Sequence, residues 1–325
     1  MREDLLQEIE QDYARIRGEN EREEARRKEI IRREQPEIQA LVLRREELIY
    51  GSLRSILKGK GSEGDLPREM EQVSASIRAA LAAKGFPEDY LAPIYRCAEC
   101  RDTGKTGEPV RQDCKCLKRM YQQKLREKIG LSAENRETFD TFDLSVFSEE
   151  PLPGRNFSQR DLMRKCRDDC EDWANRYPDA LCRDLVLTGK SGLGKTFLLR
   201  AMAERLIERG INVLIISAYR LIDAARRNYF SGDPELDEIM EAEVLMIDDL
   251  GSEPLMQNVT VEQLFNLINE RQNRGLATVI STNLSISEFR TRYTERIASR
   301  IMDRRTCRVT ALEGKDIRTG SGAKR

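Results

Sequence analysis

Short apolar runs alternate with helical patterns in the C-terminal half of the chain. The runs that predict strands cover residues 185–187, 213–217, 244–247 and 278–281. The segments between them carry apolar residues at helical spacing. This alternation is typical of a parallel sheet flanked by helices, so we predict an α/β domain over residues 135–325.

The N-terminal part, residues 1–60, has a different pattern, dense in Glu and Arg. Leu6, Ile9, Tyr13 and Ile16 recur at helical spacing, but between residues 17 and 29 the only apolar residue is alanine. We therefore expect helices, interrupted at the proline at position 36, with a polar stretch that buries no face. Two interpretations stay open: a solvated helix, or an arm that docks on a partner.

Changes in composition along the chain predict three parts. A glycine-rich linker is expected at residues 59–64, and a second helical segment at 68–84 leads into four closely spaced cysteines. A connector over residues 135–157, which carries Phe139, Phe142 and Phe147, precedes a helix predicted at 160–177. The expected domains are a helical arm (1–60), a helical segment with the cysteines (61–134) and the α/β domain (135–325).

Composition excludes several classes of function. The 325 residues contain no histidine, which excludes catalysis or metal binding by imidazole. The net charge is −1, although basic residues outnumber acidic ones between positions 290 and 325. No apolar run reaches the length of a membrane span, and the acidic N-terminus lacks the core of a secretory signal. We therefore expect a soluble, cytoplasmic protein without a membrane partner.

The strongest motif is Gly-x-x-x-x-Gly-Lys-Thr between the first predicted strand and a helical pattern. In this context the motif predicts a phosphate-binding loop. Glycines 189, 192 and 194 let backbone N–H groups converge on a phosphate, and the helix N-terminus favours an anion. Lys195 can reach the β- and γ-phosphates of ATP, and Thr196 can place its hydroxyl on Mg²⁺.

Carboxylates and arginines further along the chain complete a candidate ATP site. Asp248 and Asp249 end a predicted strand, which we expect to adjoin the strand before the loop. Asp248 is placed to hold Mg²⁺ with Thr196, and Asp249 to orient or deprotonate the attacking water. Asn283, after another strand, suits either the γ-phosphate or a turn. Three arginines are further candidates for the ATP site. Arg296 and Arg300 lie on one helical face, where they either remain solvated or complete a neighbouring subunit's ATP site. Arg318 is a candidate for contact with the phosphates.

Four cysteines form a second candidate site. Cys97-x-x-Cys100 and Cys114-x-Cys116 place two pairs of thiols on tight loops. Four thiolates suit tetrahedral Zn²⁺ and leave no open position, which predicts a structural zinc site. The alternative is four unligated thiols. The nearby Gly-Lys-Thr at 104–106 imitates the end of a phosphate loop, but no strand precedes it, and we reject it.

Together these motifs resemble those of the DnaC/DnaI helicase-loader and IstB group of AAA+ ATPases. The resemblance covers roughly residues 135–320 and is carried by positions 189–196, 245–251, 264–271, 280–283, 293–302 and 314–318. Upstream, residues 97–104 resemble the zinc segment of one type of loader, and residues 138–143 resemble the entry to the ATPase domain. The implied fold is an AAA+ P-loop parallel sheet flanked by helices, after a helical N-terminal region and a small zinc-binding segment.

The resemblance also implies roles for single residues. Lys195 and Thr196 take the Walker A positions, and Asp248 and Asp249 take the Walker B positions. Asn283 corresponds to sensor I, Arg300 to the arginine finger and Arg318 to sensor II. Arg296 lies one turn before Arg300 and is the alternative finger. Many AAA+ motors have Glu where this chain has Asp249, which favours a slow ATP switch over a fast motor.

The implied function is ATP-dependent loading of a replicative hexameric helicase onto single-stranded DNA, in replication initiation or restart, with ATP, Mg²⁺ and structural Zn²⁺ as cofactors. The hydrolysis is expected to be slow and stimulated by oligomers or DNA. Self-association would run through the ATP site, and the N-terminal helices would grip the helicase. Residues 226–230 suit either DNA contact or ordinary helix packing. The alternatives are an IstB-like transposition helper ATPase, disfavoured by the zinc segment and helical arm, and an adaptor that never hydrolyses ATP, disfavoured by the carboxylates and arginines.

Overall fold

The fold was analysed in a computed structural model that describes residues 2–57, 66–107, 109–131, 136–232, 235–255 and 260–318. Two compact units emerge. One consists of Gln7–Leu117, and the other of Met1–Leu6 with Lys118–Arg325. The three-part division expected from the sequence stays a prediction, and the expected linker at 59–64 lies outside the described residues.

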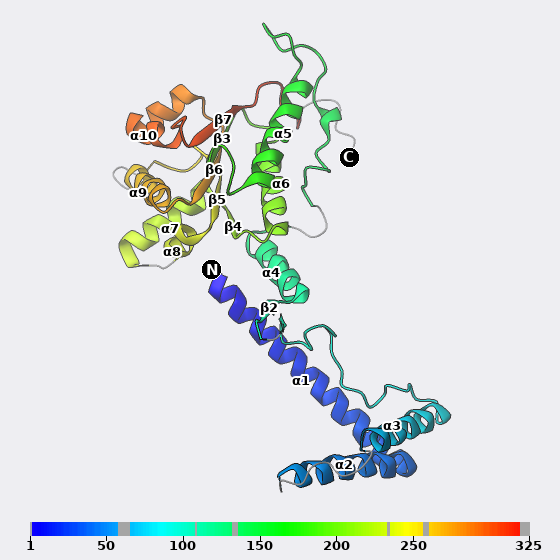
Figure 1. Cartoon of the computed structure of the whole chain (residues 1–325). Coiled ribbons are helices and arrows are strands. Elements are labelled where there is room, and N and C mark those ends of the chain that lie inside the picture. The colour runs from blue at the N-terminus through cyan, green and yellow to red at the C-terminus, as the bar shows by residue number, and fades with distance from the viewer. Residues whose placement is uncertain are drawn as a thin grey trace. The chain divides into compact units, whose positions relative to one another are not determined.

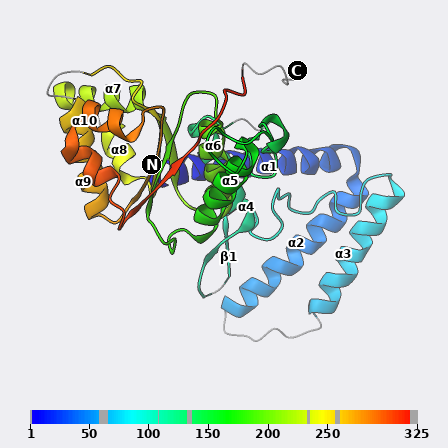
Figure 2. The ribbon, with the colours of Figure 1, turned by 90° about the horizontal axis from the view of Figure 1, so that it is seen from above.

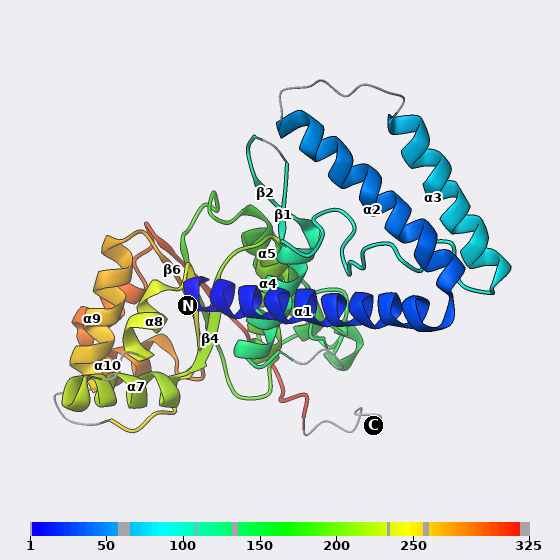
Figure 3. The ribbon, with the colours of Figure 1, turned by 90° about the horizontal axis from the view of Figure 1, so that it is seen from below.

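The N-terminal unit is built mainly from three helices, α1 (Arg2–Glu34), α2 (Pro36–Leu57) and α3 (Leu66–Ala83). The break between α1 and α2 falls at the predicted proline. Figures 2 and 3 both show α2 and α3 side by side. Between them a small core of Ile38, Ile77 and Leu81 is almost completely buried. The predicted helical character of this region is therefore confirmed.

The polar middle of α1 has no fully buried residue between positions 17 and 29, as expected, but it docks through hydrogen bonds that the apolar pattern did not predict. The guanidinium of Arg17 donates a hydrogen bond to the carbonyl of Asp102 at 2.9 Å, and the Asn20 amide donates to the Asp102 carboxylate at 2.9 Å. Asp102 itself is only 1% exposed. The apolar pattern was also misread at one position, since Leu5 is buried and Leu6 is exposed. The apolar pattern could not reveal this docking, because it depends on hydrogen bonds to the residue that carries a buried carboxylate.

The C-terminal unit contains a five-stranded parallel sheet. Its strands are β3 (Asp184–Thr188), β4 (Val213–Ser217), β5 (Val244–Leu250), β6 (Ala277–Thr282) and β7 (Cys307–Ala311), in the spatial order β4-β5-β6-β3-β7. The predicted α/β class and four predicted strands are confirmed. The fifth strand, β7, was missed because its alternation is short and follows an arginine-rich helix.

Helices cover both faces of this sheet (Figure 1). On one face lie α5 (Gln159–Arg176) and α6 (Lys195–Glu208), and on the other α7 (Ala218–Ser231), α8 (Glu235–Glu241), α9 (Thr260–Asn273) and α10 (Ile286–Ile301). Successive side chains of β5 alternate between the two cores, with Met246 packed toward α6 and Ile247 toward α9 and α10. Among the described residues, none of the helices combines the length and apolar character needed to cross a bilayer.

The P-loop helix α6 is held from outside the sheet as well. A helix that follows the cysteines, α4 (Lys115–Lys128), places Arg126 at 2.8 Å from the carboxylate of Glu204 on α6. Arg136, in the chain after α4, reaches the same oxygen at 2.8 Å. Glu204 is 2% exposed, so removal of its partners would leave an uncompensated buried charge. These two ion pairs hold α6 against α4 and the segment that leads into the α/β unit.

Candidate nucleotide-binding site and metal centre

The glycine-rich loop connects the end of β3 to the start of α6, as the motif predicts. Gly189, Gly192 and Gly194 all have positive φ angles, of 151°, 74° and 85°. At Gly192 a Cβ atom would lie 1.8 Å from a carboxylate oxygen of Asp316, so no larger residue fits there. The strand–loop–helix arrangement leaves the N-terminus of α6 free to receive a phosphate.

Lys195 begins α6 and folds back over the loop. Its side chain is almost buried, and its ammonium donates to the carbonyls of Gly189 at 2.5 Å and Lys190 at 2.8 Å. Burial lowers the pKa of Lys195, while the carboxylates of Asp249 and Asp248 act in the opposite direction. The cation is thus held at the loop by groups that a phosphate can replace.

Thr196 and Asp248 meet in space, as a shared magnesium site requires. The Thr196 hydroxyl lies 3.1 and 3.2 Å from the two carboxylate oxygens of Asp248. The expectation that their strands adjoin was wrong, because β6 pairs with both β3 and β5 and lies between them. The carboxyl ends of these parallel strands nevertheless share one edge of the sheet, which brings the two residues together.

A cavity of 480 Å³ opens above the loop and these carboxylates. Asp249 and Arg318 line it, together with three side chains that the sequence reasoning missed: Glu137, Arg200 and Ser281. Arg200 and Glu137 form an ion pair at 2.8 Å. The position of Arg200, one helical turn after Thr196, is a signal that could have identified it.

Asn283 lies outside this cavity. It is exposed and lines a neighbouring hollow of 470 Å³ with Gly189 and Lys190. Arg318, by contrast, follows Ile317, whose N–H donates to the carbonyl of Gly192 at 3.1 Å. The structure therefore brings Arg318 to the P-loop and leaves Asn283 at its side. The sensor roles of both residues stay predictions.

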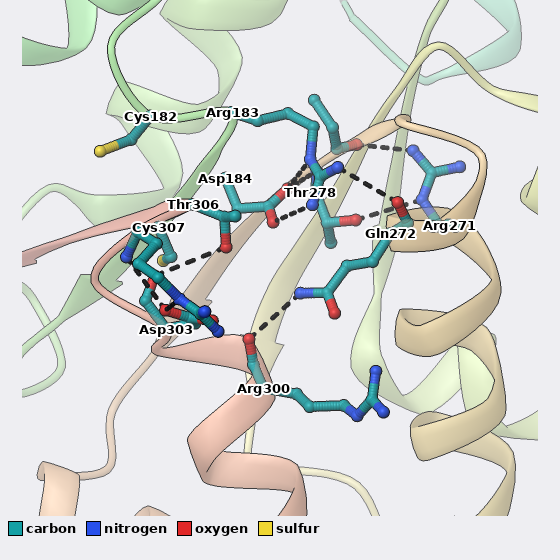
Figure 4. Close-up of polar contacts among 12 residues, drawn as sticks. Cys182, Arg183, Asp184, Arg271, Gln272, Thr278, Arg300, Asp303, Thr306 and Cys307 are labelled. Carbon is teal, nitrogen blue, oxygen red and sulfur yellow. Dashed lines mark hydrogen bonds and ion pairs between the residues drawn. The ribbon is translucent and has the colours of Figure 1, made fainter.

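Arg300 is remote from the P-loop of its own chain. Figure 4 shows its carbonyl beside Gln272, which precedes the amino end of β6, whereas the P-loop follows the carboxyl end of β3. The Gln272 amide donates to the carbonyl of Arg300 at 3.1 Å, and the Arg300 guanidinium donates to Asn269 at 2.5 Å. Arg300 is exposed in this place, and its role as an arginine finger stays a prediction.

A single aromatic ring supports both candidate finger residues. The guanidinium of Arg296 lies 4.1 Å, and that of Arg300 5.2 Å, from the centre of the Phe265 ring. Cation–π stacking of this kind restrains an exposed side chain without removing its charge. Both arginines thus lie on one surface, and each is placed to act as the arginine finger.

The four cysteines of the sequence motif converge. Their Sγ atoms all lie within 4.8 Å of one another, with Cys97 and Cys114 at 3.8 Å and Cys100 and Cys116 at 3.4 Å. Zinc–sulfur bonds of about 2.3 Å in a tetrahedron place sulfur atoms about 3.8 Å apart, so the donor set fits zinc. The N–H of Cys100 lowers the pKa of Cys97 to about 7, which favours the thiolate that a metal binds.

A short hairpin brings the two cysteine pairs together. It consists of β1 (Lys105–Thr106) and β2 (Gln112–Asp113), which pair antiparallel. The rejected Gly-Lys-Thr motif falls in β1 and opens no helix. Tyr13 of α1 contacts the cluster through its hydroxyl, 3.0 Å from the sulfur of Cys116. Helix α1 thus contacts the cysteine segment at two places, Tyr13 at Cys116 and Arg17 with Asn20 at Asp102.

Part of this chain is similar to known ATP-binding proteins. Residues 180–322 match the model of the IstB-like ATP binding protein family. The replicative helicase loader DnaI of Bacillus subtilis (strain 168) is 27% identical over 175 residues, which span 49% of this chain and 56% of DnaI. The replicative helicase loader DnaC of Escherichia coli (strain K12) is 27% identical over 152 residues, or 45% of this chain and 57% of DnaC.

An insertion-element protein gives a similar match. The IS21-like putative ATP-binding protein of Bacteroides fragilis is 27% identical over 140 residues, 42% of this chain and 52% of that protein. Among solved structures, the crystal structure of DnaI matches with a TM-score of 0.45 and 25% identity, over 60% of this chain and 98% of that one. The chain spans just over half the length of these curated relatives. The family match, residues 180–322, includes the P-loop, Asp248 and Arg318.

Proposed function

We propose that this chain is an ATP-dependent loader of a replicative DNA helicase, because residues 180–322 match the IstB-like ATP binding protein family and two helicase loaders are similar to the chain. The observation that carries the proposal is the meeting of Lys195, Thr196 and Asp248 at one cavity, in a chain that also has a separate cysteine-containing helical unit. ATP would bind with its phosphates on the loop, and Mg²⁺ would be held by Thr196 and Asp248. When bound, the metal supplies charge stabilisation at the phosphates.

ATP hydrolysis would be controlled by contacts between subunits. Arg300 is exposed and distant from its own P-loop, so it would complete the ATP site of a neighbouring copy. An arginine supplied in trans stabilises the charge that develops in phosphoryl transfer, and it makes oligomer geometry depend on nucleotide state. We expect slow hydrolysis that rises when subunits associate. Asp249 would orient the water from a carboxylate shorter than the usual Glu.

The N-terminal helices would supply the grip on the helicase. Three large apolar side chains of α2 are exposed, with fractions of 49% for Leu43, 41% for Ile49 and 68% for Tyr50. Their side chains lie outside the small core that α2 shares with α3. Exposed apolar positions on a helix suit a partner that receives them in a groove.

Single-stranded DNA would contact α7. Tyr219, Tyr229 and Phe230 are 63%, 64% and 68% exposed, and aromatic faces of this kind stack with unpaired bases. The nearby guanidinium of Arg226 already pairs with Asp223 at 2.8 Å. We therefore assign the main contribution on this helix to stacking and a smaller one to phosphate contact.

An IstB-like transposition helper is the second candidate, favoured by the family match and by the insertion-element relative. The two functions call for different partners. A transposition helper works with a transposase, whereas a loader works with a hexameric helicase. The helical unit and cysteine cluster outside the matched residues favour the loader, because they provide a second surface with its own fold.

Capture of partners tests the proposal. The immobilised full-length protein is expected to retain the replicative helicase of the same genome, and retention should change between ATP and ADP. A variant with Leu43 and Tyr50 both replaced by serine should lose most of this capture, because the apolar contact surface is removed. Leu181→Ser, which changes a side chain 98% exposed in the other unit, is the matched control and should capture normally. Retention of a transposase, with no retention of helicase in either nucleotide, would reject the loader in favour of the second candidate.

A further inference from the structure

Ser281 occupies an unusual place at the end of β6. Its side chain is 1% exposed and lines the nucleotide cavity. The hydroxyl donates a hydrogen bond to the Asp248 carboxylate at 2.6 Å and accepts one from the backbone N–H of Asp249 at 2.8 Å. One side chain thus contacts both of the acidic residues at the end of β5.

The register of β5 and β6 explains this double contact. The strands pair regularly up to Ile247 opposite Ile280, and pairing resumes with Leu250 opposite Thr282. Two residues of β5, Asp248 and Asp249, therefore stand opposite the single residue Ser281. This is the pattern of a β-bulge, which redirects side chains and is frequent beside active sites.

The backbone of Asp249 shows where the redirection occurs. Its φ angle is +56°, a left-handed conformation that residues other than glycine seldom adopt. Such a conformation persists only where the surroundings hold it. The hydrogen bond from its N–H to Ser281 is one such restraint. The other end of the bulge is tied through Asp248 to the hydroxyl of Thr196.

We propose that Ser281 is a positioning residue that sets the geometry of the magnesium site and of Asp249. The inference rests on the proposed ATP chemistry and gives a role to Ser281, which lies in the 280–283 motif but has no part in the sensor assignment. The hydroxyl fixes the Asp248 carboxylate toward Thr196, and it keeps the bulge in the form that turns Asp249 into the cavity. Asn283, two residues later, lines the neighbouring hollow and does not replace this contact.

The test measures magnesium dependence as well as turnover. For Ser281→Ala we expect turnover to fall by roughly 10- to 100-fold and the Mg²⁺ concentration for half-maximal activity to rise by a similar factor, the usual cost of losing a group that orients a metal ligand. Affinity for ATP in EDTA should stay unchanged, because the Ser281 hydroxyl contacts the Asp248 carboxylate and the Asp249 backbone and not the P-loop. Ser281→Thr keeps the hydroxyl and should restore both values.

Two comparisons keep the outcome clear. Ser252→Ala is the matched control, because its exposed hydroxyl also contacts Asp249, at the carbonyl, but from outside the cavity. It should behave as wild type. If Ser281→Ala does not fold, Ser281→Thr against Ser281→Val gives the same contrast in a pair of equal shape. A normal Mg²⁺ dependence in Ser281→Ala, or in Ser281→Val, would overturn the role of Ser281. Failure of the wild type itself to bind ATP with Mg²⁺ would instead overturn the proposed function.

Discussion

Replacing Cys100 with serine is expected to abolish zinc binding and to unfold the segment around the cysteine cluster. Four sulfur atoms at the observed separations fit one zinc ion, and structural zinc contributes apparent binding free energies of about 10–16 kcal/mol to small domains. The wild-type protein should contain one zinc per chain by elemental analysis. The variant should contain none, and its N-terminal unit should lose protection in hydrogen exchange.

The loss of protection should extend into α1. Tyr13 contacts the sulfur of Cys116, and Arg17 and Asn20 bond to Asp102 within the same unit. Asp102 in turn accepts the N–H of Cys97 at 2.7 Å, so the cluster and this part of α1 share one hydrogen-bond network. Cys182→Ser, a cysteine outside the cluster, is the control and should keep its zinc. A wild-type protein that carries no zinc after metal-replete purification would refute the metal centre.

Replacing Arg300 with alanine is expected to leave ATP binding intact and to reduce oligomer-dependent hydrolysis by roughly 10³- to 10⁵-fold, the range for an arginine finger. The reason is its position on α10, where it is exposed and lies away from its own P-loop, so that it could reach the ATP site of a second copy. Arg300→Ala mixed with Lys195→Ala should recover activity. The first variant keeps a working P-loop, the second keeps Arg300, and one type of mixed interface then contains both.

Two further variants complete this experiment. Arg296→Ala tests the alternative finger, because Arg296 shares the Phe265 ring with Arg300. Arg290→Ala is the matched control on the same helix, since its guanidinium is exposed and lies 3.6 Å from Glu295. If hydrolysis by Arg300→Ala equals that of wild type while Arg296→Ala loses it, the finger is Arg296. If neither variant loses hydrolysis, the site is not completed by this helix.

The nucleotide site could be located from the sequence because its parts are local. A P-loop is a contiguous motif, and a strand that ends in two aspartates is recognisable without knowledge of the fold. The meeting of Thr196 and Asp248 followed from the general rule that carboxyl ends of parallel strands share an edge. Strand order was harder, since nothing in the two segments indicates that β6 lies between them.

What the sequence did not provide depends on register and on polar contacts between distant segments. Ser281 is unremarkable in the sequence and gains its place from a one-residue bulge in its partner strand. The docking of α1 depends on Asp102, a buried carboxylate some eighty residues away, which no periodicity of apolar residues could reveal. Glu137 likewise reaches the cavity through the fold of the connector.

The central prediction is that the loop between β3 and α6 binds the triphosphate of ATP. Titration of the wild-type protein and of Lys195→Ala with a fluorescent ATP analogue, with and without Mg²⁺, tests this most directly. We predict saturable binding to the wild type that Mg²⁺ strengthens, and none to Lys195→Ala, since that change removes the buried ammonium at the loop. Absence of binding to correctly folded wild type, or equal binding by the variant, would contradict the account.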